Sequence, residues 1–111
     1  IGASATFIKR EESVECLISE NLPVGVCHKV EIETTKRRLK DGDFIIMVSD
    51  GVLEYLHVPN PEETMKRLIA GIKTNHPGKM AKQILERVML YTGGRVEDDM
   101  TVMTAAIWEK E

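Results

Sequence analysis

The 111-residue sequence has no excess of positive charge, since 15 Lys and Arg stand against 18 Asp and Glu for a net charge of -3. A nucleic-acid partner is not expected, because such a surface needs cations to neutralise backbone phosphates. The sequence also has no apolar run near the roughly 20 residues that cross a bilayer, and its first residues lack the basic and apolar regions of a signal peptide. We therefore expect a soluble segment with no membrane contact of its own.

Cysteine is scarce, and Cys16 and Cys27 are spaced neither as a redox pair nor as part of a zinc site. They are expected to be reduced, mostly buried small hydrophobes, which favours a cytoplasmic location. The histidines lack ligand spacing as well and are expected at the surface or at helix caps: His28, His57 and His76.

Aromatic residues make up only 5% of the chain, and no basic residues are interleaved with them as in a base-stacking surface. Three of them are expected to be packing residues: Tyr55, Tyr91 and Trp108. The length fits one domain that buries roughly two-thirds of its unfolded surface.

What the sequence does contain is an aspartate at the end of an apolar strand. Residues 44–48 read Phe-Ile-Ile-Met-Val and are followed directly by Ser49-Asp50-Gly51. A second acidic pair, Asp98-Asp99, precedes another strand-like run near the C-terminus. Two strand ends that each carry an aspartate suit one shared Mg²⁺ or Mn²⁺, because these hard cations prefer carboxylate oxygens. Ser-Asp-Gly and Asp-Asp are also ordinary turn sequences, so turn formation is the alternative.

The periodicity predicts a mainly antiparallel sheet. A hairpin is expected from strands over 6–10 and 13–19, followed by a strand over 29–39 that has one polar face. Lys40-Asp41-Gly42-Asp43 predicts a turn, in which Asp41 and Asp43 are turn residues and not ligands. The strand over 44–48 is apolar on both faces and is expected to be central and buried, and the strand over 101–108 is expected to be mostly buried.

Two helices are expected between these last two strands. The first starts at Asn60-Pro61, an N-cap followed by Pro at the first helical position, and it continues through Gly71. The second follows His76-Pro77 and stops at Gly93-Gly94. Strands followed by consecutive helices, without βαβ alternation, predict an α+β fold with mostly antiparallel strands and a two-helix insertion before the last strand.

Taken together, five motifs in this order resemble the metal-dependent serine/threonine phosphatases of type 2C, within the bacterial branch typified by stage II sporulation protein E. They are Gly2-Ala3-Ser4-Ala5-Thr6-Phe7-Ile8-Lys9-Arg10, Asn21-Leu22-Pro23-Val24-Gly25, Leu39-Lys40-Asp41-Gly42-Asp43, Met47-Val48-Ser49-Asp50-Gly51-Val52 and Asp98-Asp99-Met100-Thr101-Val102. The resemblance covers essentially the whole chain. It implies a β-sandwich flanked by helices, with residues 1–111 forming the C-terminal half of the domain.

The resemblance also implies the chemistry. Asp50 and Asp98 match two metal ligands of a two-metal manganese or magnesium centre, while Asp99 stands where many relatives carry Asn and is not expected to be a ligand. Gly51 would serve the turn, and Ser49 would orient Asp50. The family's bridging aspartate has no counterpart before Asp50, so the isolated chain is expected to be inactive.

By the same resemblance, the substrate is a phosphorylated anti-anti-sigma factor, whose dephosphorylation activates a sporulation sigma factor. The domain would act in the cytoplasm, with membrane anchoring by a segment outside this chain. The alternative is a noncatalytic regulatory or protein-interaction module, in which the two helices between Asp50 and Asp98 form a docking surface and nearby apolar residues are exposed. Against this stands a short helix or turn that packs the same residues over the sheet: Val52, Leu53, Tyr55 and Leu56. Half a sandwich would leave apolar sheet surface uncovered, so homodimerisation is a further expectation.

Overall fold

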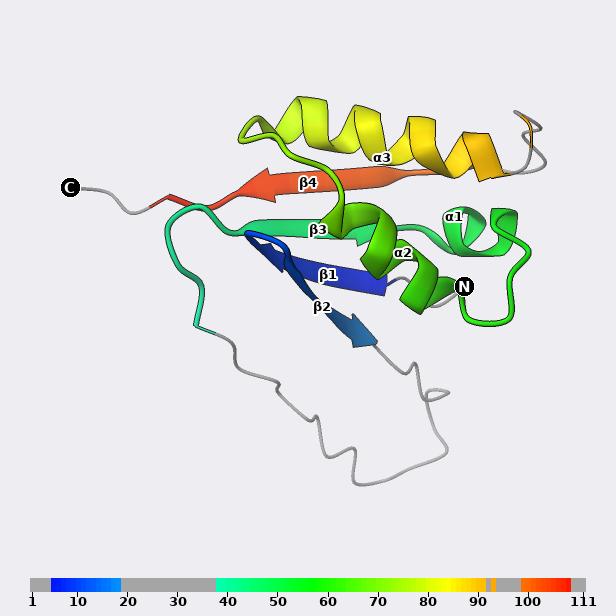
Figure 1. The fold of residues 1–111 in the computed structure, drawn as a ribbon, viewed down its shortest axis with the longest axis horizontal. Helices are drawn as coiled ribbons and strands as arrows, with labels where there is room; N and C mark the ends of the chain where they lie inside the picture. Colours follow the sequence, from blue (N-terminus) through cyan, green and yellow to red (C-terminus); the bar gives the residue numbers. More distant parts are fainter. Residues whose placement is uncertain (1–4, 19–37, 92, 94–98, 109–111) are drawn as a thin grey trace, which may run out of the picture.

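The computed structural model describes residues 5–18, 38–91, 93 and 99–108. In these ranges the chain forms one sheet with helices packed against it (Figure 1). The elements, in chain order, are β1 (Ala5–Arg10), β2 (Ser13–Ile18), β3 (Phe44–Val48), α1 (Asp50–Tyr55), α2 (Pro61–Ala70), α3 (Pro77–Tyr91) and β4 (Val102–Ala106). The predictions for Cys27, His28, Asp98 and nearly all of the strand over 29–39 concern residues outside this description.

The sheet has the order β2-β1-β3-β4, and every described pair of strands is antiparallel. The predicted α+β class is thereby confirmed, with the helices lying between β3 and β4 in the sequence. The β1–β2 hairpin turns at Glu11, whose backbone adopts φ 55°, and the Lys9 ammonium donates to the Glu11 carbonyl. The apolar run over 44–48 forms β3, a central strand, as predicted.

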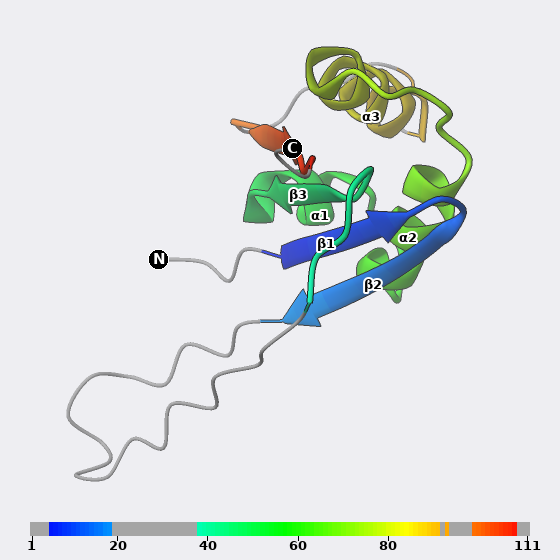
Figure 2. The same ribbon diagram turned by 90° about the vertical axis from the view of Figure 1, so that its left-hand side faces the viewer.

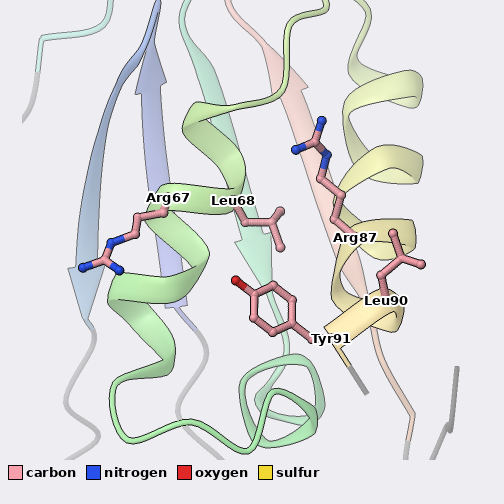
Figure 3. Close-up of a pocket in the computed structure, with 5 residues that line it drawn as sticks. All are labelled: Arg67, Leu68, Arg87, Leu90 and Tyr91. Atoms are coloured by element: carbon pink, nitrogen blue, oxygen red, sulfur yellow. The ribbon is translucent and has the colours of Figure 1, made fainter. Parts of the chain in front are cut away.

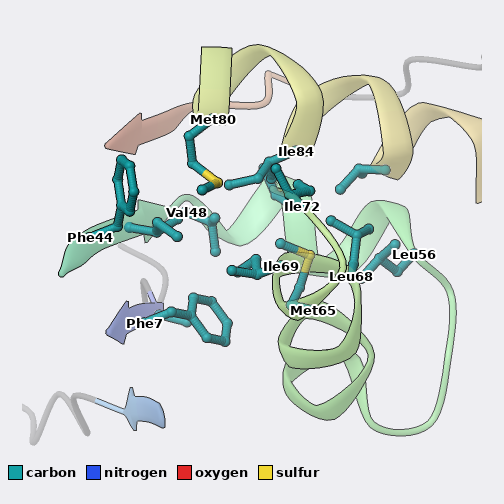
Figure 4. Packing of buried hydrophobic residues seen from close by; sticks show 14 of the residues in the cluster. Phe7, Phe44, Val48, Leu56, Met65, Leu68, Ile69, Ile72, Met80 and Ile84 are labelled. Atoms are coloured by element: carbon teal, nitrogen blue, oxygen red, sulfur yellow. The ribbon is translucent and has the colours of Figure 1, made fainter. Parts of the chain in front are cut away.

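The core lies between one face of the sheet and the helices α2 and α3, which gather on the same side (Figure 2). Phe7, Phe44 and Val48 point from the sheet into this layer (Figure 4). The first helical segment contributes Met65, Leu68 and Ile69 from α2 and Ile72 just beyond its end, and α3 contributes Met80, Ile84 and Val88. The periodicity also predicts Leu85 and Met89 on the apolar side of α3, but both are only partly buried. Val52, Tyr55 and Leu56 are buried in the same cluster, so this short helical segment packs against the core beside α2 and does not expose these residues for docking.

The helix boundaries follow local signals. The Asn60 side-chain oxygen accepts a hydrogen bond from the Glu63 N–H at 3.2 Å, and Pro61 opens α2. The ring nitrogen Nδ1 of His76 accepts from the Lys79 N–H at 3.4 Å, which makes His76 the expected capping residue of α3. Gly71 was expected inside the first helix, but α2 ends at Ala70 and Gly71 is its C-cap.

The opposite face of the sheet is open within the described part of the chain. Met47 is 43% exposed and its cross-strand neighbour Met103 is 62% exposed. The prediction that β3 is buried on both faces is therefore wrong for the described residues, as is the expectation of a mostly buried last strand. Trp108 is 79% exposed and is not a packing residue here. The reason is that the helices cover a single face and β4 lies at the sheet edge.

Candidate metal centre

Asp50 lies where β3 ends and α1 begins. Val48 is the last strand residue, Ser49 is the helix N-cap with extended backbone, and Asp50 is the first helical residue. Its side chain is half-buried. The strand end thus presents a carboxylate from a regular, hydrogen-bonded element, which restricts its movement.

The ends of β3 and β4 are joined beyond the sheet ladder. Val48 pairs with Val102 in the antiparallel register. One residue further out, the Ser49 N–H donates to the Thr101 carbonyl at 3.0 Å. The Thr101 N–H in turn donates to the Ser49 hydroxyl oxygen at 3.0 Å. These two hydrogen bonds place Asp50 and the segment that enters β4 at the same end of the sheet.

Gly51 is in contact with the segment that carries Asp99. A Cβ atom on Gly51 would lie 2.1 Å from the Asp99 carbonyl oxygen, a separation that real Cβ atoms essentially never show. Gly51 is helical, so its role is the close approach of two backbones and not the turn predicted for it. Similarly, the Ser49 hydroxyl bonds the Thr101 backbone and does not cap α1.

The side chains described at this end of the sheet supply only some of the oxygen ligands that a hard divalent cation needs. Asp50 offers carboxylate oxygens, and oxygen is the ligand atom that Mg²⁺ and Mn²⁺ favour. Among the described residues, however, no group of three or more His, Cys, Asp or Glu side chains forms a cation site. Asp99 is exposed, and Asp98 lies outside the description. The assignment of Asp50 and Asp98 as ligands therefore stays a prediction, and further donors must come from elsewhere.

Asp41 and Asp43 lie at the opposite end of β3, as expected of turn residues. The buried Asp43 carboxylate accepts from Arg10 Nε at 2.9 Å and from Arg10 Nη2 at 2.7 Å. It also accepts from the Lys40 N–H at 2.8 Å. The hydrogen bonds from Arg10 lower the pKa of Asp43, against the opposing effect of burial. This bidentate pair ties the end of β1 to the turn before β3 and is structural.

Replacing Asp43 with Asn is expected to destabilise the domain by about 2 kcal/mol at neutral pH, because hydrogen bonds to a charged group are lost. The pKa of Asp43 is lower in the folded protein than in the unfolded chain, so the ionised carboxylate stabilises the fold at any pH above its unfolded-state pKa. This stabilisation is lost as the pH falls through the pKa of the folded state. The difference between wild type and variant should thus shrink progressively below about pH 5. Urea unfolding across this pH range measures it. Asp41→Asn, in the exposed part of the same turn, is the matched control, and an equal effect of both variants would contradict the assignment.

Sequence comparison identifies the family. The family model described as stage II sporulation protein E (SpoIIE) matches residues 1–108. This chain belongs to the SpoIIE family. Stage II sporulation protein E of Bacillus subtilis is 40% identical over 108 residues, which are 96% of this chain and 13% of that protein. The chain therefore spans only a small part of its curated SpoIIE relative.

Solved SpoIIE structures share the fold. One contains the PP2C phosphatase domain and a fragment of the regulatory domain of SpoIIE from B. subtilis, with 40% identity, a TM-score of 0.83, and coverage of 96% of this chain and 32% of that one. A second, the SpoIIE phosphatase domain described as Mn presoaked, has 35% identity and a TM-score of 0.80 and covers 99% of this chain and 49% of that one. The α+β fold described above is thus that of part of a PP2C phosphatase domain. In the described ranges, no helix is long and apolar enough to cross a membrane.

Proposed function

We propose that this chain is the C-terminal half of a metal-dependent protein serine phosphatase domain, in which Asp50 and Asp98 each contribute a ligand to a two-metal manganese or magnesium centre. The observation that carries the proposal is the hydrogen-bonded junction of Ser49 and Thr101, which brings the Asp50 turn beside the segment that enters β4. The likeness to the SpoIIE phosphatase domain, of which this chain covers about half, supports it.

When bound, the two cations would activate water for direct attack on phosphorus and offset the negative charge of the phosphoryl oxygens. The chain's own contribution is to hold carboxylates in place. Asp50 is fixed by the end of β3 and the first turn of α1. Because the Ser49–Thr101 hydrogen bonds connect the two strand ends, a shift of either segment would displace the ligands on the other.

The substrate we propose is a phosphorylated anti-anti-sigma factor, whose dephosphorylation would activate a sporulation sigma factor in the cytoplasm. Anchoring of the complete protein to the membrane belongs to the same proposal. The support is membership of the SpoIIE family. The alternative is a noncatalytic interaction module whose docking surface is formed by the two helices between Asp50 and Asp98. It loses the apolar contacts expected at Val52, Tyr55 and Leu56, because these residues are buried.

The proposal is tested by comparing this chain alone with the complete domain, in which an N-terminal half from the SpoIIE family precedes it. Only the complete domain is expected to hydrolyse a phosphoserine peptide, and only with Mn²⁺ or Mg²⁺, because two carboxylates leave most of the coordination shell to water. EDTA should abolish the activity. Phosphate release measures turnover.

The exposed sheet face around Met47 and Met103 is tested separately. Size-exclusion chromatography of the chain alone would show whether this face drives self-association.

Turnover by the chain alone would contradict the division of the site between two halves. A complete domain that is folded and inactive with both cations would overturn the phosphatase proposal and favour a regulatory binding module.

A further inference from the structure

A groove of about 480 Å³ lies between α2 and α3, and its lining does not include Ser49, Asp50 or Thr101. Five residues line it, two from α2 and three from α3 (Figure 3): Arg67, Leu68, Arg87, Leu90 and Tyr91. The sequence suggests these two helices as an alternative docking surface, but it does not identify the lining residues, because they come from two separately predicted helices.

The groove has an apolar surface that the core does not use. Leu68 belongs to the core cluster and forms the floor. At the C-terminal end of α3, Leu90 is 79% exposed and Tyr91 is 55% exposed, so Tyr91 is not the packing residue that the sequence predicts. Exposed leucine and tyrosine side chains beside a hollow are typical of contact surfaces, where Tyr contributes much of the binding energy.

The groove is also positively charged. Arg67 extends from α2 and Arg87 from α3, at the rim of the groove, and both guanidinium groups point away from the Tyr91 ring (Figure 3). No acidic residue lines the groove, and the ion pairs found among the described residues, Arg10–Asp43 and Lys66–Glu63, leave both of these arginines out. On a chain of net charge -3, two arginines beside exposed apolar side chains form a local surface complementary to acidic and apolar groups.

The groove faces the end of the domain that holds the candidate metal site. The C-terminal end of α3, with Leu90 and Tyr91, lies at the same end of the sheet as α1 and the end of β3 (Figure 1). A protein that occupies the groove would therefore lie beside the edge that presents Asp50.

We propose that the groove between α2 and α3 is a docking surface for an acidic, partly apolar segment of the protein substrate, separate from its phosphoserine. This inference rests on the proposed phosphatase function. Carboxylates of the segment pair with Arg67 and Arg87, and its apolar side chains pack on Leu90 and Tyr91. Docking of this kind selects a protein substrate by a surface remote from the phosphoryl group, and the opposite charges speed the encounter.

The test measures binding of a phosphorylated anti-anti-sigma factor to the complete domain carrying Asp50→Asn, in which turnover is blocked. The double variant Arg67→Glu/Arg87→Glu is expected to raise the Kd at least tenfold. The matched control is Lys79→Glu/Lys82→Glu, which makes the same change in charge at exposed positions of α3 outside the groove and should leave the Kd within twofold. Arg67→Lys/Arg87→Lys, which keeps the charge, should lie between wild type and the Glu variant.

Three results would overturn the docking proposal: no detectable binding to the parent domain, an unchanged Kd in the groove variant, or an equal loss in the control. Hydrolysis of p-nitrophenyl phosphate by the wild-type domain tests the phosphatase proposal independently, since this small substrate has no docking segment. If that hydrolysis is absent but the groove variant still weakens binding, the groove is confirmed as a docking surface and the phosphatase proposal fails.

Discussion

The Asp50→Asn variant of the complete domain is expected to lose more than about 100-fold in manganese-dependent hydrolysis, since even the loss of residues that support a metal ligand costs 10- to 100-fold. The amide keeps the size of the side chain but removes the negative charge that attracts the cation. The measurement is kcat/KM for p-nitrophenyl phosphate as a function of Mn²⁺ concentration, together with Mn²⁺ affinity by calorimetry.

The acidic pair before β4 supplies the controls. Asp98→Asn should be as damaging as Asp50→Asn, whereas Asp99→Asn should retain most of the activity because Asp99 is exposed and is not assigned as a ligand. The same conservative change at three positions thus separates ligands from neighbours. Full activity of Asp50→Asn, or loss in Asp99→Asn alone, would contradict the assigned ligand set.

The Gly51→Ala variant is expected to be nearly as damaging, by a different route. Its Cβ would meet the Asp99 carbonyl oxygen at 2.1 Å. That oxygen belongs to the backbone and cannot rotate away, so the two segments must separate by about 1 Å, and a displacement of this size costs on the order of 100-fold in rate. Overpacking should also destabilise the domain by about 1–3 kcal/mol. Hydrolysis of p-nitrophenyl phosphate and urea unfolding measure the two effects.

Gly71→Ala is the matched control for this substitution. Gly71 has φ -80°, and a Cβ there would lie 3.4 Å from the end of the flexible Arg87 side chain. It should leave both hydrolysis and stability close to wild type. If Gly51→Ala behaves in the same way, the contact between the α1 turn and the segment entering β4 does not position the site.

The elements that could be predicted from the sequence are those determined by neighbouring residues. Asn60-Pro61 and His76-Pro77 mark helix starts because capping and proline geometry act over a few residues. The β1–β2 hairpin and the turn before β3 follow from short-range chemistry in the same way. The placement of Asp50 at the end of a strand belongs to this class, because an apolar run ending in Ser-Asp-Gly is a local pattern.

Contacts between distant residues could not be predicted in this way. Arg10 and Asp43 are 33 positions apart, and neither side chain carries a local sign of its partner. In the sequence Gly51 resembles a turn glycine. It is required, however, because the backbone of Asp99, 48 residues later, leaves no room for a side chain. Met47, Met103 and Trp108 have apolar side chains typical of a core, but the helices cover the other face of the sheet.

By itself, then, the sequence determined the types and order of the described strands and of α2 and α3, and the position of Asp50 at a strand end. Each of these depends on backbone preferences and periodicity within about ten residues. The tertiary structure alone decided which sheet face is covered, how closely the ends of β3 and β4 approach, and where α2 and α3 leave a groove. These depend on how complete elements pack together, and packing is a property of surfaces that residues far apart in the chain build jointly.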